Sequence, residues 1–195
     1  MKKEVIAICI IIVVAIIASV ILLYPKPPIS IDDLKKEAKS TFKLYSPAFE
    51  YGGSIPVKYT CKGDDTSIPL SWEGYPDNTK SFLIIMYDPD APSGTFIHWI
   101  VYNIPPNVNS LPEGIAKESR IEGLCCQGVN DFGRIGYGGP CPPPGPKHRY
   151  FIIIFALDSM LDISGSVKLN DVLSAAKGHV LAYAEYMGKF GLPTM

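Results

Sequence analysis

Residues 81–104 read SFLIIMYDPDAPSGTFIHWIVYNI, two apolar runs joined by a segment rich in turn-forming residues. The first run, residues 81–87, and the second, residues 96–104, carry many β-branched and aromatic side chains. Short apolar runs of this composition are typical of strands that are buried on both faces. Because only DPDAPSGT separates the two runs, we expect them to pair as an antiparallel hairpin.

Other parts of the chain repeat the strand pattern. A third apolar run, YFIIIFAL, covers residues 150–157, and shorter candidates cover residues 43–45, 57–59 and 70–72. Residues 170–177 are predicted to form a helix, with Asn170 as N-cap and Gly178 as its stop, whereas residues 180–187 fit either a helix or a strand. Strands that follow one another without long helices between them predict antiparallel sheets stacked face to face, a mainly β fold.

The composition limits the classes of function. The chain has 195 residues, a formal net charge of −1, 47% hydrophobic residues and 19% charged residues. This length fits one domain plus an extension, and the hydrophobic content excludes wholesale disorder. Since no basic excess is present to neutralise phosphate backbones, we do not expect nucleic-acid binding.

The N-terminal segment predicts a membrane anchor. Residues 5–23 read VIAICIIIVVAIIASVILL, a run without a charge that is about long enough to span a bilayer as a helix. The run is longer than the apolar region of a cleavable signal peptide and closes with bulky residues, so we favour an uncleaved anchor over a cleaved signal. Lysines on both sides leave the orientation undecided, and the short N-terminal tail favours a single-pass protein of the cell membrane with an extracytoplasmic globular part.

We therefore expect three segments: a transmembrane anchor at residues 1–24, a proline-rich and charged spacer at residues 25–40, and one globular domain at residues 41–195. The spacer includes a short helix within residues 31–40, with Ser30 as its N-cap. The charged character of this helix predicts that it is solvated.

Polar side chains lie at the ends of the strongest strand candidates. Asp88 follows the first run and His98 lies near the start of the second, so a hairpin places both at one edge of the sheet. His148 and Tyr150 begin the third run and share one face, because side chains alternate along a strand. Arg149 takes the other face, where we expect it to anchor the structure through an ion pair.

A long loop, residues 128–147, precedes His148, and 11 of its 20 residues are Gly or Pro. Loops of this length without secondary structure are usually functional or disordered. The glycines permit a close approach of the backbone, and residues 136–140 are predicted to present their amides to an anion as a nest.

Two enzymatic interpretations are weaker than binding. Asp88, His98 and His148 have the composition of a metal site with two histidines and one carboxylate. Cys141, near His148, is a candidate nucleophile, but the prolines around it indicate a rigid wall rather than an activated thiolate. We therefore expect neither a bound metal nor a catalytic activity.

The cysteines of the globular part allow more than one arrangement. Cys61, Cys125, Cys126 and Cys141 can pair in three ways, and the pairing that joins the neighbours Cys125 and Cys126 is strained. Two alternatives remain: disulfides from Cys61 and Cys141 to the neighbouring pair, or free buried thiols.

Several motifs in this order resemble the phosphatidylethanolamine-binding protein family, and in particular its prokaryotic, Raf kinase inhibitor-like branch. They are LSW at residues 70–72, DPDAP at 88–92, HW at 98–99, NDFGRIGYGGPCPP at 130–143 and HRY at 148–150. The resemblance implies an antiparallel β-sandwich with a small anion-binding pocket at one end. Matched by motif, the implied pocket residues are Asp88, Asp90, His98, Pro140, His148 and Tyr150, and Phe96 stands where eukaryotic members often have Trp.

The resemblance and the residues together predict a membrane-anchored, non-enzymatic protein that binds phosphate-bearing or other anionic ligands, such as a lipid headgroup, a nucleotide or a phosphopeptide. The histidines and Tyr150 supply donors, and loop amides around Gly139 complete the cradle. Asp88 and Asp90 orient the histidines or receive an ammonium group. No cofactor is expected. The alternative is an inhibitor of a serine protease or a kinase that acts through protein–protein contacts of its exposed loops.

Overall fold

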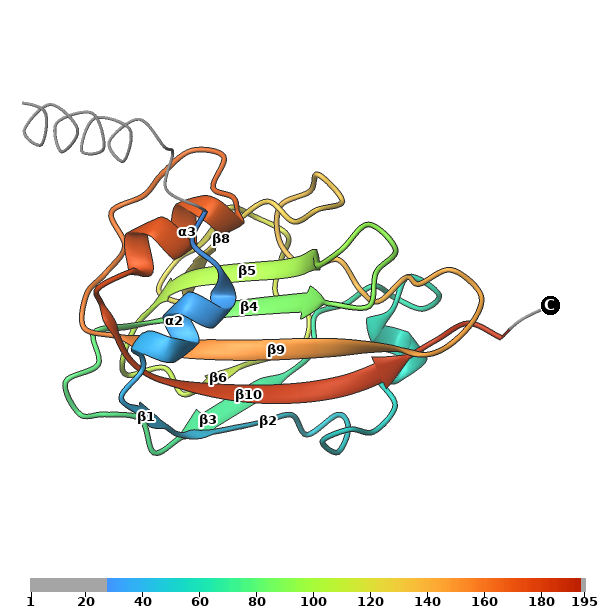
Figure 1. Cartoon of the computed structure of the whole chain (residues 1–195), viewed down its shortest axis with the longest axis horizontal. Helices are drawn as coiled ribbons and strands as arrows, with labels where there is room; N and C mark the ends of the chain where they lie inside the picture. The colour runs from blue at the N-terminus through green and yellow to red at the C-terminus, as the bar shows by residue number, and fades with distance from the viewer. Residues whose placement is uncertain (1–27, 194–195) are drawn as a thin grey trace, which may run out of the picture.

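The computed structural model describes residues 28–193, which form two β-sheets and two α-helices (Figure 1). The strands are β1 (Ser40–Thr41), β2 (Lys43–Tyr45), β3 (Leu70–Glu73), β4 (Ser81–Asp88), β5 (Phe96–Ile104), β6 (Ser110–Leu111), β7 (Arg120–Ile121), β8 (Cys125–Gln127), β9 (His148–Leu157) and β10 (Val180–Phe190). The helices are α2 (Ile31–Glu37) and α3 (Leu169–Ala176), and a 3₁₀ turn, η1, covers Val57–Tyr59.

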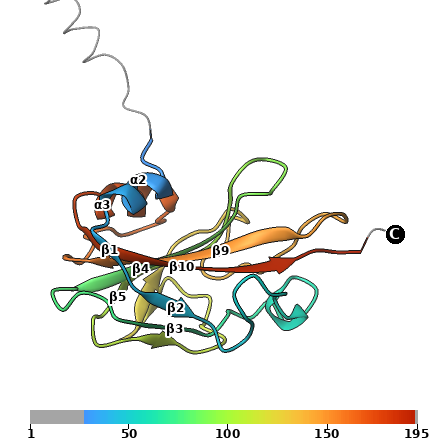
Figure 2. The ribbon, with the colours of Figure 1, turned by 60° about the horizontal axis from the view of Figure 1, so that its bottom comes forward.

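The two sheets stack as the strand pattern predicted. The large sheet has seven strands in the order β1-β10-β9-β4-β5-β8-β7, and the small sheet has three in the order β2-β3-β6. All pairings between neighbouring strands are antiparallel except that of β1 with β10. Figure 2 shows β2 and β3 against one face of the large sheet, and α2 and α3 against the other. The fold is therefore mainly β, with few helices.

The hairpin of β4 and β5 lies inside this arrangement. Phe82, Ile84 and Met86 of β4 belong to the hydrophobic core between the two sheets. Leu83 and Ile85, which alternate with them, belong to the second core beneath the helices. Because each face of β4 contacts a different layer, the strand needs apolar residues at successive positions, which explains its unbroken apolar sequence.

The structure decides one assignment that the sequence left open and corrects another. Residues 180–187 are part of β10, which pairs along its length with β9 and alternates between buried and less buried positions. Residues 57–59 were predicted to be a strand, and this was wrong: they form η1, closed by the Tyr59 amide donating to the Pro56 carbonyl and by the Thr60 hydroxyl donating to the Val57 carbonyl.

The predicted helix near residue 170 is α3, but its N-cap differs from the prediction. The cap is Lys168, not Asn170, because the Asp171 carboxylate accepts a hydrogen bond of 2.8 Å from the Lys168 amide. This bond satisfies one of the free amides at the start of the helix. The helix ends just before Gly178, whose φ of +87° favours glycine.

Helix α2 is part of the folded unit, contrary to the expectation of a solvated spacer. Ser30 caps it as predicted, with Asp33 completing a capping box. Leu34 is fully buried against the large sheet, and Lys35 forms an ion pair of 2.9 Å with Glu185 of β10. The charged residues of the helix led to the prediction that it is solvated. Its apolar residues, however, cover a face of the sheet that would otherwise contact water.

The predicted anchor at residues 5–23 lies outside the described residues, so it stays a prediction. Within residues 28–193, no helix has the length and apolar character that crossing a bilayer requires.

Candidate functional site

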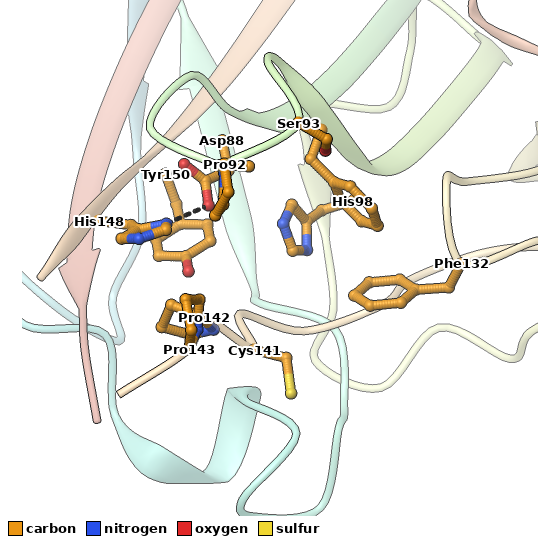
Figure 3. Close-up of a pocket in the computed structure, with 12 residues that line it drawn as sticks. Asp88, Pro92, Ser93, His98, Phe132, Cys141, Pro142, Pro143, His148 and Tyr150 are labelled. Atoms are coloured by element: carbon orange, nitrogen blue, oxygen red, sulfur yellow. Dashed lines mark hydrogen bonds and ion pairs between the residues drawn. The ribbon is translucent and has the colours of Figure 1, made fainter. Parts of the chain in front are cut away.

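A cavity of about 300 Å³ opens at the end of the large sheet, where β4 ends and β5 and β9 begin. Its lining combines a few polar side chains with apolar ones: Asp88, Ala91, Pro92, Ser93, Phe96, His98, Phe132, Cys141, Pro142, Pro143, His148 and Tyr150 (Figure 3). Asp88, the two histidines and Tyr150 come from three adjacent strands, whereas Ser93 and most of the apolar members come from the loops that follow β4 and precede β9.

Asp88 and His148 form a buried pair on one side of this cavity. The Nδ1 of His148 donates to Oδ2 of Asp88 over 2.7 Å, and both residues are at most 9% exposed. The other carboxylate oxygen of Asp88 accepts the Asp90 amide at 2.8 Å. These contacts fix the imidazole tautomer, so the Nε2 of His148 is the nitrogen left for a ligand.

His98 is held from the opposite side of the cavity. Its Nδ1 donates to the Gly138 carbonyl over 2.7 Å, while its own carbonyl accepts the Gly138 amide at 2.9 Å. The sequence placed Asp88 and His98 at one edge, and both line the cavity, but the carboxylate binds His148 rather than His98. Burial lowers the pKa of His98, so its imidazole is neutral at pH 7.

Tyr150 is fully buried and lies between the two histidines. Its ring centroid is 5.2 Å from that of His98 and 6.5 Å from that of His148. Besides burial, the Asp88 carboxylate is near enough to raise the pKa of Tyr150, but the Tyr150 hydroxyl makes no hydrogen bond of normal geometry with any described residue. Burial raises the pKa of Tyr150, so the hydroxyl keeps its proton and can donate it to a ligand.

Arg149 points away from the cavity, as strand alternation predicted, and it binds the Asp90 carboxylate there. The Arg149 amide and Nε each donate to Asp90 over 2.9 Å, and Nη2 donates over 2.6 Å. The Arg149 guanidinium lowers the pKa of Asp90 to about 2. Asp90 therefore does not line the cavity, contrary to the expectation, because its carboxylate is committed to the outer face of β9.

Gly139 and Pro140 also lie outside the cavity lining. The Gly139 amide donates to Asp65 over 2.6 Å, and the Pro140 carbonyl accepts the Cys61 amide at 3.1 Å. The amides of Gly136 and Gly138 are likewise bound to carbonyl oxygens. The predicted amide nest at residues 136–140 is therefore not formed, because this segment is fastened to neighbouring loops and strands.

The apolar rim of the cavity was identified only in part from the motifs, which singled out Phe96 but not Phe132. Phe96 and Phe132 meet edge to face with centroids 4.7 Å apart, and Pro92, Pro142 and Pro143 complete the walls. The sequence signal was present in the NDFG motif: the Asn130 side chain accepts the amides of Phe132 and Arg134 and thereby shapes the turn that presents the Phe132 ring.

The structure has one disulfide among its described residues, Cys61–Cys141, while Cys125 and Cys126 are free. Neither alternative drawn from the sequence was right. Cys125 and Cys126 are successive residues of β8 and belong to opposite faces of the sheet, so neither approaches the Cys61–Cys141 pair. The bridge also removes the candidate nucleophile, because Cys141 has no thiol.

The candidate metal ligands do not assemble. Across residues 28–193, no group of three or more His, Cys, Asp and Glu side chains is arranged to hold a metal ion.

Known proteins match this chain over almost all of its folded part. The family model described as phosphatidylethanolamine-binding protein matches residues 45–191, which include every cavity residue. A UPF0098 protein of Methanothermobacter thermautotrophicus is 46% identical over 147 residues, covering 75% of this chain and 97% of that protein.

Two solved structures are similar over comparable lengths. A putative phosphatidylethanolamine-binding protein homologue from Chlamydia trachomatis has 43% identity and a TM-score of 0.70, covering 78% of this chain and 98% of that chain. YbcL of E. coli, named as a member of the mammalian family, has 31% identity and a TM-score of 0.73, covering 78% and 99%.

Proposed function

This chain belongs to the phosphatidylethanolamine-binding protein family, and from that premise we propose that its cavity binds phosphate-bearing or other anionic groups without transforming them. Lipid headgroups, nucleotides and phosphopeptides all carry such a group. The Tyr150 hydroxyl is a donor in this proposal, and the Nε2 atoms of His98 and His148 donate when their imidazoles are protonated, because the Nδ1 atoms are already bound to Gly138 and Asp88.

The unpartnered hydroxyl of Tyr150 is the observation that supports this proposal most. A buried hydroxyl without a partner is costly, by about 1–3 kcal/mol, and native structures rarely keep one without a reason. Tyr150 lines a cavity that two histidines also line. An acceptor such as a phosphate or carboxylate oxygen would satisfy the hydroxyl.

The chemistry around the cavity favours binding over catalysis. Cys141 is occupied by its disulfide, and within the described structure the Ser93 hydroxyl makes no hydrogen bond with either histidine. A hydroxyl nucleophile needs such a contact with a base for activation. We therefore propose a non-enzymatic role.

We further propose that residues 5–23 hold this domain at the cell membrane, on its extracytoplasmic side. The uninterrupted apolar sequence supports the anchor. The Cys61–Cys141 disulfide supports the side, because disulfides persist mainly in oxidising compartments. Fractionation of cells after carbonate treatment tests the anchor, and protease digestion of intact cells tests the side.

A titration of full-length protein in detergent with phenyl phosphate at pH 6 tests the binding site. His148→Ala should weaken binding about 10- to 150-fold, the equivalent of a hydrogen bond to a charged group worth about 1.5–3 kcal/mol. His179→Ala is the matched control, since His179 also pairs with a carboxylate, Asp158, at 2.8 Å, but is exposed and outside the cavity.

Equal losses in both variants, or none in either, would remove the cavity from consideration as the binding site. The alternative role, inhibition of a serine protease or kinase, rests on no separate contact in the structure and stays a prediction. A protease assay with purified protein tests it.

A further inference from the structure

We propose that the cavity selects a singly charged oxyanion joined to an apolar body, a phosphodiester or a carboxylate, over a doubly charged phosphomonoester or free phosphate. This inference rests on the proposed anion-binding function and narrows its ligand class. It follows from the charges that face the cavity and from the composition of its walls.

The cavity has little positive charge to offer. Its lining contains no Lys or Arg, and its one carboxylate, Asp88, is buried beside the ligand donors. Positive charge therefore comes only from His98 and His148. A proton on His148 is already balanced by Asp88 at 2.7 Å, and His98 is neutral because it is buried.

The charged groups near the cavity do not change this balance. The Asp131 carboxylate, which accepts the Ile97 amide at 2.7 Å, adds negative charge behind His98. Arg149 faces away and is neutralised by Asp90. The Lys147 ammonium donates a hydrogen bond of 3.3 Å to the Ser54 hydroxyl. Arg134 stacks over Phe132 at 5.3 Å and is exposed to solvent. A second negative charge on a ligand thus meets Asp88 without a matching cation.

The walls of the cavity call for an apolar group next to the head group. Phe96, Phe132, Pro92, Pro142 and Pro143 line the space toward the rim. A free phosphate would leave these surfaces in contact with water, whereas an aromatic or aliphatic body removes them from it. A volume of about 300 Å³ is at the small end of the range for ligand pockets, enough for one ring and its head group.

Four probes separate ligand charge from ligand shape: phenyl phosphate, methyl phenyl phosphate, benzoate and inorganic phosphate. At pH 8 phenyl phosphate carries two charges, since the second pKa of a phosphomonoester is about 6, while the diester and benzoate carry one. We expect the diester to bind full-length protein in detergent at least tenfold more tightly than phenyl phosphate at pH 8, with inorganic phosphate weakest. Benzoate shows whether a carboxylate serves as well as a phosphodiester.

Lowering the pH to 5.5 should reduce the difference in affinity between the monoester and the diester. Phenyl phosphate then carries mainly one charge, whereas the charge of the diester is unchanged. Both ligands meet the protein in the same state at a given pH, so the ratio of their affinities reports the charge of the ligand. Asp88→Asn should also reduce the difference in affinity at pH 8, because it removes the opposing carboxylate. Asp158→Asn, at the exposed pair with His179, should leave the difference unchanged.

The possible results separate this inference from the function on which it rests. If phenyl phosphate binds as tightly as the diester at pH 8, the charge selection is refuted while anion binding stands. If none of the four probes binds at either pH, the proposed function itself fails. The ratio in the unsubstituted protein decides the matter even if Asp88→Asn does not fold.

Discussion

Replacing Tyr150 by Phe removes one oxygen atom and leaves the ring in place. The Tyr150 hydroxyl is buried and lacks a partner within the described residues, and Tyr150 lines the cavity with both histidines. If its role is to meet a ligand, the substitution should stabilise the unliganded protein and weaken binding. These opposite signs distinguish a ligand donor from an ordinary structural hydroxyl.

The magnitudes follow from the cost of a buried unsatisfied group. Removing the hydroxyl should raise the free energy of unfolding by about 1–2 kcal/mol, because an unpaired buried polar group costs about 1–3 kcal/mol. For a domain of this size, each kcal/mol raises Tm by roughly 2–4 °C. Loss of a hydrogen bond to an anion, about 1.5–3 kcal/mol, should weaken binding about 10- to 150-fold.

Urea unfolding without ligand and calorimetric titration with methyl phenyl phosphate measure the two effects. Tyr137→Phe is the matched control, because the Tyr137 hydroxyl is also buried but donates to the Tyr59 carbonyl at 2.7 Å. That variant should lose about 0.5–1.5 kcal/mol of stability and bind normally. If Tyr150→Phe is destabilised like the control and binds ligand as before, its hydroxyl has an internal partner and the reasoning is refuted.

Three other predictions concern the scaffold. Replacing Cys61 and Cys141 together by Ser should lower the free energy of unfolding by about 4–5 kcal/mol in urea titrations, since the bridge spans a sequence separation of 80; an unchanged midpoint would contradict the loop-closure argument. Leu34→Ala should cost about 2–5 kcal/mol in the same assay if α2 is a true part of the core. Arg149→Ala should lower the thermal midpoint at pH 7. The pKa of Asp90 is depressed to about 2 from 3.8, so the difference in midpoint between the variant and the unsubstituted protein should persist above pH 4. It should vanish as the pH falls through 2.

Local patterns in the chain were sufficient for the strands and for the direction of their side chains. Residues 81–87 and 96–104 form the hairpin that their apolar runs predicted, because β-branched and aromatic residues favour extended backbone and burial. Alternation along β9 correctly placed His148 and Tyr150 inside and Arg149 outside. Periodicity is a property of consecutive residues, so the sequence alone specifies it.

Charge, by contrast, misled the interpretation of residues 31–40. A helix with three acidic and two basic residues was predicted to be solvated, yet Ile31 and Leu34 form a face that the large sheet buries. Whether so short an apolar face is covered depends on what lies beside it in the fold, and local sequence does not record that.

The partners of the polar groups were decided by tertiary structure alone. Asp88 binds His148, which is 60 positions away, because β9 and β5 flank β4 on opposite sides and only His148 reaches the carboxylate. The Gly139 amide is taken by Asp65, and Cys141 by Cys61, because the long loop folds back onto the segment after η1. A sequence states which groups can donate, accept or bond, but strand order and loop closure decide which of them come within about 3 Å of one another.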